Sequence, residues 1–230
     1  MSNRTLAGLP LPTLPGRRWM GPVVVLGLAL AAAAMIAEGV MERGDLSQYD
    51  PGIGRWFISE RTPVLTPLAS DLAVLGGPAL NVLVATCVVW LWVRRFRGDA
   101  VFVALTMALA GITTSVLKLV FARPRPASGL IGPVSHSYAF PSGHTVNTTV
   151  FVGLLGLLAW HARPRRAWRV AIVAVWLGTS VTMAASRVYL AYHWFTDVVG
   201  GLTIAVGILA AAVLARQLVA LRHGSWPPAE

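Results

Sequence analysis

The sequence predicts an all-α fold, an integral membrane bundle of six transmembrane helices. The first observation behind this prediction is composition: 56% of the 230 residues are hydrophobic, 12% are charged, and the mean hydropathy is +0.66. A soluble globular domain carries about 25% charged residues, so this composition excludes a disordered chain and disfavours an ordinary soluble enzyme. The second observation is that runs without charge recur at the length of about 20 residues that an α-helix needs to cross a bilayer.

Charged residues and helix-breaking segments set the limits of the six expected spans. Arg18 precedes the first run, Arg94 closes the second, and the stretch from Pro126 to His144 is too rich in Gly, Pro and Ser for a regular helix. The expected spans are residues 19–37, 72–93, 100–120, 145–162, 170–190 and 194–219. They form one membrane domain, residues 19–219, between an N-terminal tail, 1–18, and a C-terminal tail, 220–230.

The first span and the segment after it require separate interpretation. The first apolar run follows Arg17 and Arg18 as a secretory signal would, but it is longer than a usual signal core, so we expect an uncleaved span. The segment 45–71 mixes Trp56 and Phe57 with charges and prolines. This mixture predicts an interfacial turn or a short surface helix on the outer side.

The loops carry charge asymmetrically, which predicts the orientation. The side that holds both termini has 12 arginines and two acidic residues, whereas the other side has 7 basic and 7 acidic residues. Because Lys and Arg accumulate in cytoplasmic loops, both termini are expected in the cytoplasm of a multi-pass cell-membrane protein. The single cysteine, Cys87, excludes an internal disulfide and suggests no thiolate metal cluster.

Three groups of polar residues stand at the outer ends of these spans. Lys118 is followed, after six residues, by Arg125-Pro126, and the fourth span opens with Pro141-Ser142-Gly143-His144. The third group runs Ser186-Arg187, then His193 after five residues, then Asp197 after three more. Alternating spans bring all three groups to the same membrane face, so we expect the active site there.

The histidine and aspartate of the third group suit nucleophilic catalysis. His193 and Asp197 are spaced i, i+4, which on a helix places their side chains on one face. A carboxylate that accepts a proton from one imidazole nitrogen leaves the other as a free lone pair, and this is how a histidine becomes a nucleophile.

The remaining motif residues suit an anion. Ser142 and Gly143 stand at a helix start, where unpaired N–H groups and the helix dipole attract negative charge. Lys118, Arg125 and Arg187 supply positive charge for phosphate oxygens. Pro124 and Pro126 should end the preceding helix and let Arg125 fold back toward Lys118.

The three groups together resemble the signature of the type 2 phosphatidic acid phosphatase superfamily, which reads K-x6-R-P, P-S-G-H and S-R-x5-H-x3-D. Every position of this signature is present between Lys118 and Asp197, about a third of the chain. The resemblance implies a membrane lipid phosphatase that uses no metal and no other cofactor. It also implies that His193 attacks phosphorus with the support of Asp197, that His144 protonates the leaving oxygen, and that the other five hold the phosphate: Lys118, Arg125, Ser142, Gly143 and Arg187.

The motifs describe a phosphate and leave its lipid open. The resemblance offers undecaprenyl diphosphate, phosphatidic acid and phosphatidylglycerol phosphate, taken from the bilayer, with no nucleic acid as a partner and no signal for an oligomeric state. One alternative is a vanadium-dependent haloperoxidase, whose relatives are soluble. Another is a non-enzymatic transporter or channel for anionic lipids, which would be expected to carry charge near mid-membrane. The 18 arginines against one lysine are typical of a GC-rich bacterial genome.

Several neighbouring residues receive other interpretations. Arg123 lies outside the motif, so a surface role and a phosphate contact are equally expected, and His136 is expected in solvent. Gly200, Gly201 and Ala205 are small residues at helical spacing, typical of helix packing. Four aromatic residues are expected in an interfacial belt or at the lipid entrance: Tyr189, Tyr192, Trp194 and Phe195.

Overall fold

The structure is a computed structural model that describes residues 19–42, 44–160 and 165–222. These residues form helices and connections without a strand, which confirms the predicted all-α class. The helices are α1 (Met20–Glu42), the 3₁₀-helix η1 (Asp45–Tyr49), α2 (Asp50–Ser59), α3 (Leu65–Leu75), α4 (Pro78–Val93), α5 (Arg97–Phe121), α6 (Gly143–Ala159), α7 (Arg166–Tyr189) and α8 (Phe195–Arg222).

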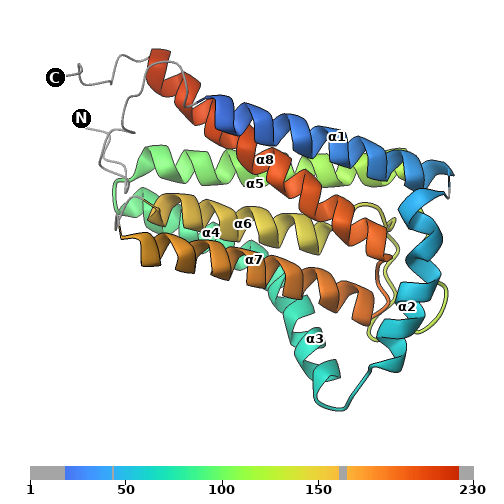
Figure 1. Cartoon of the computed structure of the whole chain (residues 1–230). Coiled ribbons are helices and arrows are strands. Elements are labelled where there is room, and N and C mark those ends of the chain that lie inside the picture. The colour runs from blue at the N-terminus through green and yellow to red at the C-terminus, as the bar shows by residue number, and fades with distance from the viewer. Residues whose placement is uncertain (1–18, 43, 161–164, 223–230) are drawn as a thin grey trace.

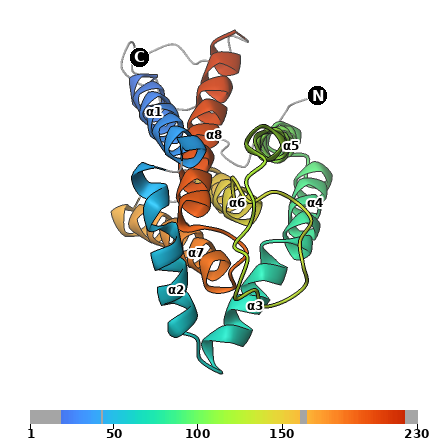
Figure 2. The same ribbon diagram turned by 90° about the vertical axis from the view of Figure 1, so that its right-hand side faces the viewer.

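Helix α6 lies at the centre of the bundle, against α5, α7 and α8, while α1 packs along α8 (Figures 1 and 2). The core between these helices is apolar and closely packed, with Val103, Val146, Val150 and Leu154 fully buried. Because lipid is as apolar as the core, the helices also pack through small residues that let backbones approach.

The glycines predicted to serve helix packing do so. A Cβ atom on Gly200 would lie 2.5 Å from the ring of Phe140, and one on Gly201 would lie 3.2 Å from the carbonyl oxygen of Ser142. Ala205 is fully buried on the same helix. The start of α8 therefore lies directly against the segment that leads into α6.

The prediction of six membrane spans is confirmed in part. Four helices among the described residues are long and apolar enough to cross a membrane: α1, α5, α7 and α8. Large apolar side chains on these helices face outward, including Leu28, Leu105 and Leu119. Helix α6 is apolar but has only 17 residues.

The expectation of one continuous span over residues 72–93 is wrong. The structure divides this region into α3, which begins earlier at Leu65, and α4, and the two helices meet at an angle of 43° (Figure 1). The break falls at Gly76 and Gly77, before Pro78, whose ring removes a backbone donor. The Gly77 N–H therefore bonds to the Val74 carbonyl, 3.3 Å away, rather than to that of Ala73. By length and composition, the pair is either one broken span or a re-entrant loop.

The segment expected as an interfacial turn or short surface helix contains η1, α2 and the first half of α3. Trp56 of α2 is largely exposed, as an interfacial side chain would be, whereas Asp50 at the start of α2 is buried. This segment thus sends one acidic side chain inward, and that side chain reaches the candidate site.

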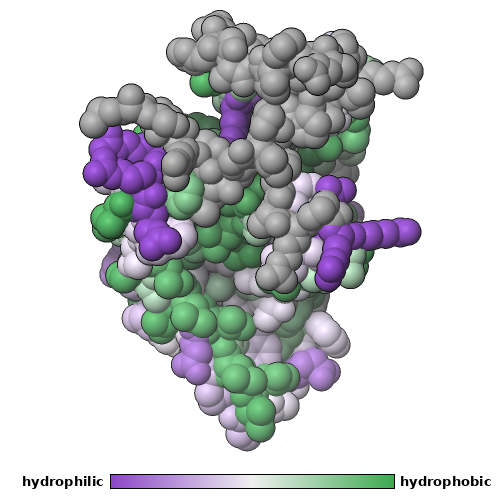
Figure 3. Space-filling view, turned by 90° about the vertical axis from the view of Figure 1, so that its left-hand side faces the viewer, coloured by the Kyte–Doolittle hydropathy of each residue, from purple (hydrophilic) through white to green (hydrophobic). Residues whose placement is uncertain are grey.

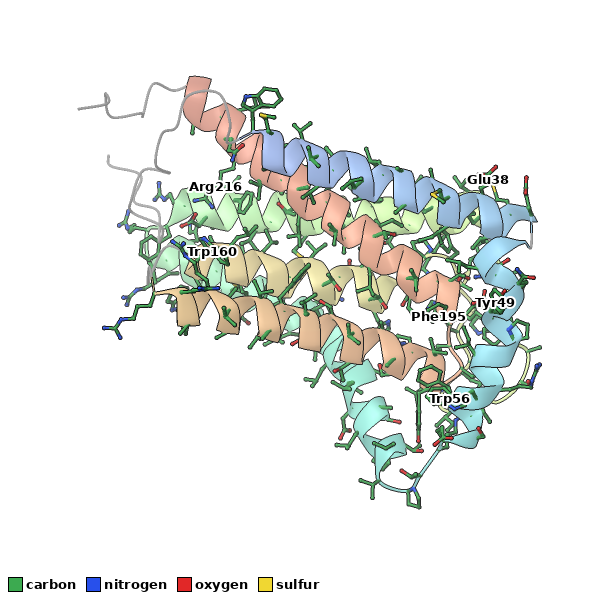
Figure 4. All side chains as sticks on the ribbon, viewed as in Figure 1. Glu38, Tyr49, Trp56, Trp160, Phe195 and Arg216 are labelled. Atoms are coloured by element: carbon green, nitrogen blue, oxygen red, sulfur yellow. The ribbon has the colours of Figure 1, made fainter. Side chains whose placement is uncertain are left out.

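The bundle has two opposite ends, at each of which several helices begin or finish. Arg216 and Trp160 lie at the end where α1 begins and α8 finishes, and Phe195 and Tyr49 lie at the other end (Figure 4). Seen from the first end, hydrophilic side chains adjoin a largely hydrophobic surface (Figure 3). There Arg216 donates to Asp99 at 2.7 Å. Of the predicted cytoplasmic tails, residues 1–18 and 223–230 lie outside the described residues, while 220–222 belong to the end of α8.

Candidate active site

The three motif groups meet at the end of the bundle where α7 gives way to α8. The connection between α5 and α6, residues 122–142, crosses this end (Figure 2). Within the connection, the Ala139 N–H donates to the Arg123 carbonyl at 2.8 Å, and at its end the Ser142 N–H donates to the Asp197 carbonyl in α8 at 3.1 Å. The second and third groups are therefore in direct contact.

His193 lies in the turn between α7 and α8. The Arg187 carbonyl accepts hydrogen bonds from the N–H groups of Tyr192 and His193, and Ala191 adopts a left-handed φ of 59°, which folds the turn back on α7. The His193 side chain is almost fully buried. Its Nδ1 lies 3.4 Å from Oδ2 of Asp197, and its Nε2 lies 3.4 Å from Nη1 of Arg125.

The spacing of His193 and Asp197 arises differently from the expected shared helix face. Helix α8 begins at Phe195, and His193 therefore lies before the helix. The helix begins there because Oδ2 of Asp197 accepts the Trp194 N–H at 2.9 Å. A carboxylate in the first turn that reaches back to the backbone is one half of a capping box, which fixes the helix start. The same carboxylate oxygen therefore both caps α8 and faces the imidazole.

Burial keeps the imidazole of His193 neutral. Loss of hydration lowers its pKa from 6.5 to about 3, against the opposing effect of Asp197, while Arg125 and Lys118 lower the pKa further. At neutral pH His193 is thus an uncharged base, with Nδ1 toward a carboxylate and Nε2 toward a guanidinium.

Arg125 and Lys118 extend over the site from either side of the α5 end. Arg125 donates from Nη1 to the Tyr192 carbonyl at 2.6 Å and from Nε to the Ser137 carbonyl at 2.7 Å. Lys118 donates to the carbonyl of Tyr138. Helix α5 ends at Phe121, ahead of the two prolines, and Arg125 comes back to Lys118 as predicted, since both donate to the Tyr138 carbonyl.

Arg187 is the buried cation of the group. Its guanidinium lies 4.3 Å from the centre of the Tyr192 ring, an arrangement in which the ring face favours positive charge. Its Nε and Nη1 are buried and have no hydrogen-bond partner among the described residues. Buried donors of this kind are uncommon and call for an acceptor, and phosphate oxygens match the fork of a guanidinium.

Ser142 and Gly143 begin α6, as the sequence predicts. Ser142 is fully buried, and its hydroxyl accepts a hydrogen bond from Thr145 at 3.0 Å. The first N–H groups of a helix have no partner within it, so this start offers donors and the positive end of the dipole to an anion.

His144 extends from α6 to the break between α3 and α4. Its Nε2 lies 3.1 Å from the carbonyl oxygen of Ala73, the acceptor that the break leaves without a helical partner. Because a carbonyl only accepts, Nε2 carries the proton in this contact. Gly77 allows the approach, since a Cβ atom there would lie 2.9 Å from Nε2. No pattern in the sequence indicates this neighbour.

Arg123 and Asp50 are the residues that sequence reasoning missed. Arg123 is mostly buried and donates from Nη1 to Asp197 and from Nη2 to Asp50, so the surface role expected for it is wrong. For Arg123, the only available signal was that Arg123-Pro124 repeats the Arg-Pro pair of the motif, Arg125-Pro126. Asp50 stands next to Pro51 in a segment without a motif.

The expectation of an interfacial belt is wrong for Tyr189 and Tyr192. Tyr189 and Tyr192 are buried: the Tyr189 hydroxyl accepts the Thr62 N–H at 2.9 Å, and the Tyr192 hydroxyl donates to the Pro133 carbonyl at 2.8 Å. Tyr189 thus joins the end of α7 to the residues before α3, and Tyr192 joins the turn after α7 to the connection between α5 and α6. His136 is exposed, as expected.

Comparison with protein families gives a match that covers more than half of the chain. The matching model is described as the PAP2 superfamily, and it aligns with residues 99–220. This range contains all three motif groups.

Two curated proteins match most of the chain. A putative undecaprenyl-diphosphatase, YbjG, of Escherichia coli is 30% identical over 161 residues, which are 66% of this chain and 77% of that protein. Phosphatidylglycerophosphatase B of Bacillus subtilis is 25% identical over 74% of this chain and 84% of its own length.

Two solved structures share the fold. A transmembrane PAP2-type phosphatidylglycerolphosphate phosphatase from Bacillus subtilis superimposes with a TM-score of 0.72 at 23% identity, covering 86% of this chain and 96% of its own. LpxE from Aquifex aeolicus gives a TM-score of 0.57 at 22% identity, over 73% of this chain and 94% of its own.

Proposed function

The chain belongs to the PAP2 superfamily, and from this premise we propose that it removes phosphate from a membrane lipid through a phosphohistidine on His193, without a metal ion. The chain is a phosphatase that hydrolyses phosphate esters or diphosphates of lipids, and it is a multi-pass membrane protein. The predicted resemblance is thereby confirmed.

One observation carries the proposal for the site. Nε2 of the neutral, buried His193 faces the guanidinium of Arg125, and Arg187 holds two buried donors without a described partner. An anion that satisfies these donors would stand in front of a nitrogen lone pair. This arrangement supports attack by His193 on a phosphorus atom, with Asp197 stabilising the positive charge that develops on the imidazole.

The proposed reaction has two steps. In the first, the lone pair of His193 Nε2 forms a bond to phosphorus, and the bond from phosphorus to the leaving oxygen breaks. His144, protonated on both ring nitrogens, gives its Nδ1 proton to that oxygen and keeps the Nε2 proton that faces the Ala73 carbonyl. In the second, water attacks phosphorus, His144 takes the water proton, and the P–N bond breaks to release phosphate and neutral His193. Lys118, Arg125, Arg187 and the start of α6 at Ser142 and Gly143 hold the phosphate oxygens in both steps.

The lipid is proposed as one of three: undecaprenyl diphosphate, phosphatidic acid or phosphatidylglycerol phosphate. The names of the relatives support the first and the third. The site is proposed to face away from the cytoplasm, because the arginine-rich loops lie at the other end of the bundle. The substrate would then come from the outer leaflet.

The test is a phosphate-release assay with the purified full-length protein in detergent. The panel holds a prenyl diphosphate, two glycerophospholipid phosphates and a soluble phosphate ester, each measured with and without a chelator. We expect release from at least one lipid, unchanged by the chelator and abolished in His193→Ala. Rapid alkaline quenching with labelled substrate should place the label on the peptide that contains His193. Label on Ser142 would contradict the assignment of the nucleophile.

A further inference from the structure

We infer that Asp50 and Arg123 are positioning residues that act on His193 through Asp197. The inference rests on the proposed function of His193 and extends it to residues outside the three motifs. Asp50 begins α2, in the segment between α1 and α3, whereas Arg123 follows the end of α5. The two come from distant parts of the chain and meet at the first turn of α8.

Arg123 bridges two buried carboxylates. Its Nη1 donates to Oδ1 of Asp197 at 2.5 Å, and its Nη2 donates to Oδ2 of Asp50 at 2.6 Å. Both aspartates are 1% exposed or less. A guanidinium can serve two acceptors with a fixed fork, which the single ammonium of lysine does not reproduce. One oxygen of Asp197 is therefore held by Arg123, while the other faces His193 and the Trp194 N–H.

Asp50 in turn holds the first turn of α8. Its Oδ1 accepts the Thr196 N–H at 2.9 Å, and its Oδ2 accepts the Thr196 hydroxyl at 2.5 Å. Thr196 immediately precedes Asp197, so Asp50 fixes both the backbone that carries Asp197 and the guanidinium that binds it. Asp50 thereby controls the aim of Asp197 at Nδ1 of His193 without touching the imidazole itself.

The charges of the group support the same role. Asp197 and Arg123 alone form a neutral pair, and Asp50 makes the buried unit net negative. Opposite this unit stand the cations Lys118 and Arg125, which both disfavour positive charge on His193. As the imidazole attacks phosphorus it becomes positive, and a fixed negative unit behind it stabilises that state.

Replacement of either residue should therefore slow the chemical step and leave phosphate binding intact. We expect Asp50→Asn to lower kcat by about 10- to 100-fold, the usual cost of losing the outer partner of an oriented histidine. KM and the inhibition constant of inorganic phosphate should stay unchanged, because Lys118 and Arg187 are untouched. Arg123→Gln should lose at least as much, and Arg123→Lys should recover part of the loss.

A double-variant cycle tests whether the two act together. Residues that work as one unit are not additive, so Asp50→Asn with Arg123→Gln should lose less kcat than the product of the two single losses. The matched control is Arg216→Gln, which breaks the pair of Arg216 with the buried Asp99 at the opposite end of the bundle. It should keep the kcat of the wild type.

All variants are measured as full-length protein that elutes as a single species in detergent, beside wild type and His193→Ala. A kcat for Asp50→Asn within about twofold of wild type overturns the inference. A parallel loss of kcat and phosphate inhibition, matched by Arg216→Gln, also overturns it, because it shows a general effect on folding. If instead wild type is no more active than His193→Ala on every lipid of the panel, the proposed function fails, and the inference falls with it.

Discussion

The pKa of His193 is set by two opposing influences, the neighbouring carboxylate of Asp197 and burial, and it determines how the rate of the enzyme should depend on pH. Because burial lowers the pKa of His193 to about 3, the neutral form persists as the pH falls through 6.5. We expect the acid limb of kcat/KM to lie well below pH 6.5, the ordinary histidine value. A profile measured from about pH 4 to about pH 9 checks this. An acid limb centred near 6.5 would contradict the assignment of His193 as the buried nucleophile.

His144 is proposed as a proton donor, so its importance should depend on the leaving group. The variant His144→Ala should lose about 10²- to 10⁴-fold in kcat on an alkyl phosphate, whose alkoxide is a poor leaving group. It should lose much less on a phosphate ester with an activated phenol, which leaves without a proton. His136→Ala, on the exposed loop, is the matched control and should behave as wild type on both substrates. An equal loss on both would remove His144 from the acid role.

At the scale of elements, the break between α3 and α4 leaves the Ala73 carbonyl, near the end of α3, in contact with the site residue His144. A methyl group at Gly77 would lie 2.9 Å from Nε2 of His144 and 3.0 Å from the Ala73 carbonyl. Gly77→Ala should therefore displace the imidazole and lower kcat on an alkyl phosphate by about 10- to 100-fold, as small misplacements of reacting groups do.

The control for Gly77→Ala is a glycine in a helix with free space around it. Gly111 in α5 and Gly178 in α7 have nothing within 4 Å of a built Cβ. Alanine at either position should leave kcat unchanged. If Gly77→Ala has no larger effect than these two, the contact between His144 and α3 has no part in turnover.

The helices themselves were largely predictable, and the break was not. Charge-free runs located α1, α5, α7 and α8 because the hydrocarbon core fixes the length of a span. Gly76, Gly77 and Pro78 were visible in the sequence, but they lie within an apolar run whose hydropathy predicts one straight helix. Their effect depends on His144 and on α3, which a local pattern does not reveal.

The residues of the site likewise include some that the sequence predicts and some that it does not. That the eight motif residues gather at one end of the bundle could be predicted, because they stand next to the ends of charge-free runs that alternate in direction. Asp50 could not, because 73 residues separate it from Arg123 and no spacing links the two. Only the folded chain brings them into contact.

At the scale of the whole molecule, the prediction concerns sidedness. Single cysteines in a Cys87→Ser background can be labelled on intact cells with an impermeant thiol reagent. We expect labelling at Val134→Cys, in the exposed connection between α5 and α6, and none at Arg165→Cys, at the start of α7. Arg165→Cys should become reactive once the membrane is permeabilised, which serves as its control. The reverse pattern would place the site in the cytoplasm.

The contact between Asp50 and Arg123 also limits how this chain can be recombined with its relatives. The family match covers residues 99–220 and so includes Arg123, whereas Asp50 lies upstream of it. A chimera that takes its first 98 residues from another family member keeps the guanidinium and receives a carboxylate only if the donor has one at the equivalent place. Without it, Arg123 remains as a buried cation with one carboxylate fewer. The segment that carries the motifs therefore depends on the first 98 residues for one of the two carboxylates that Arg123 binds.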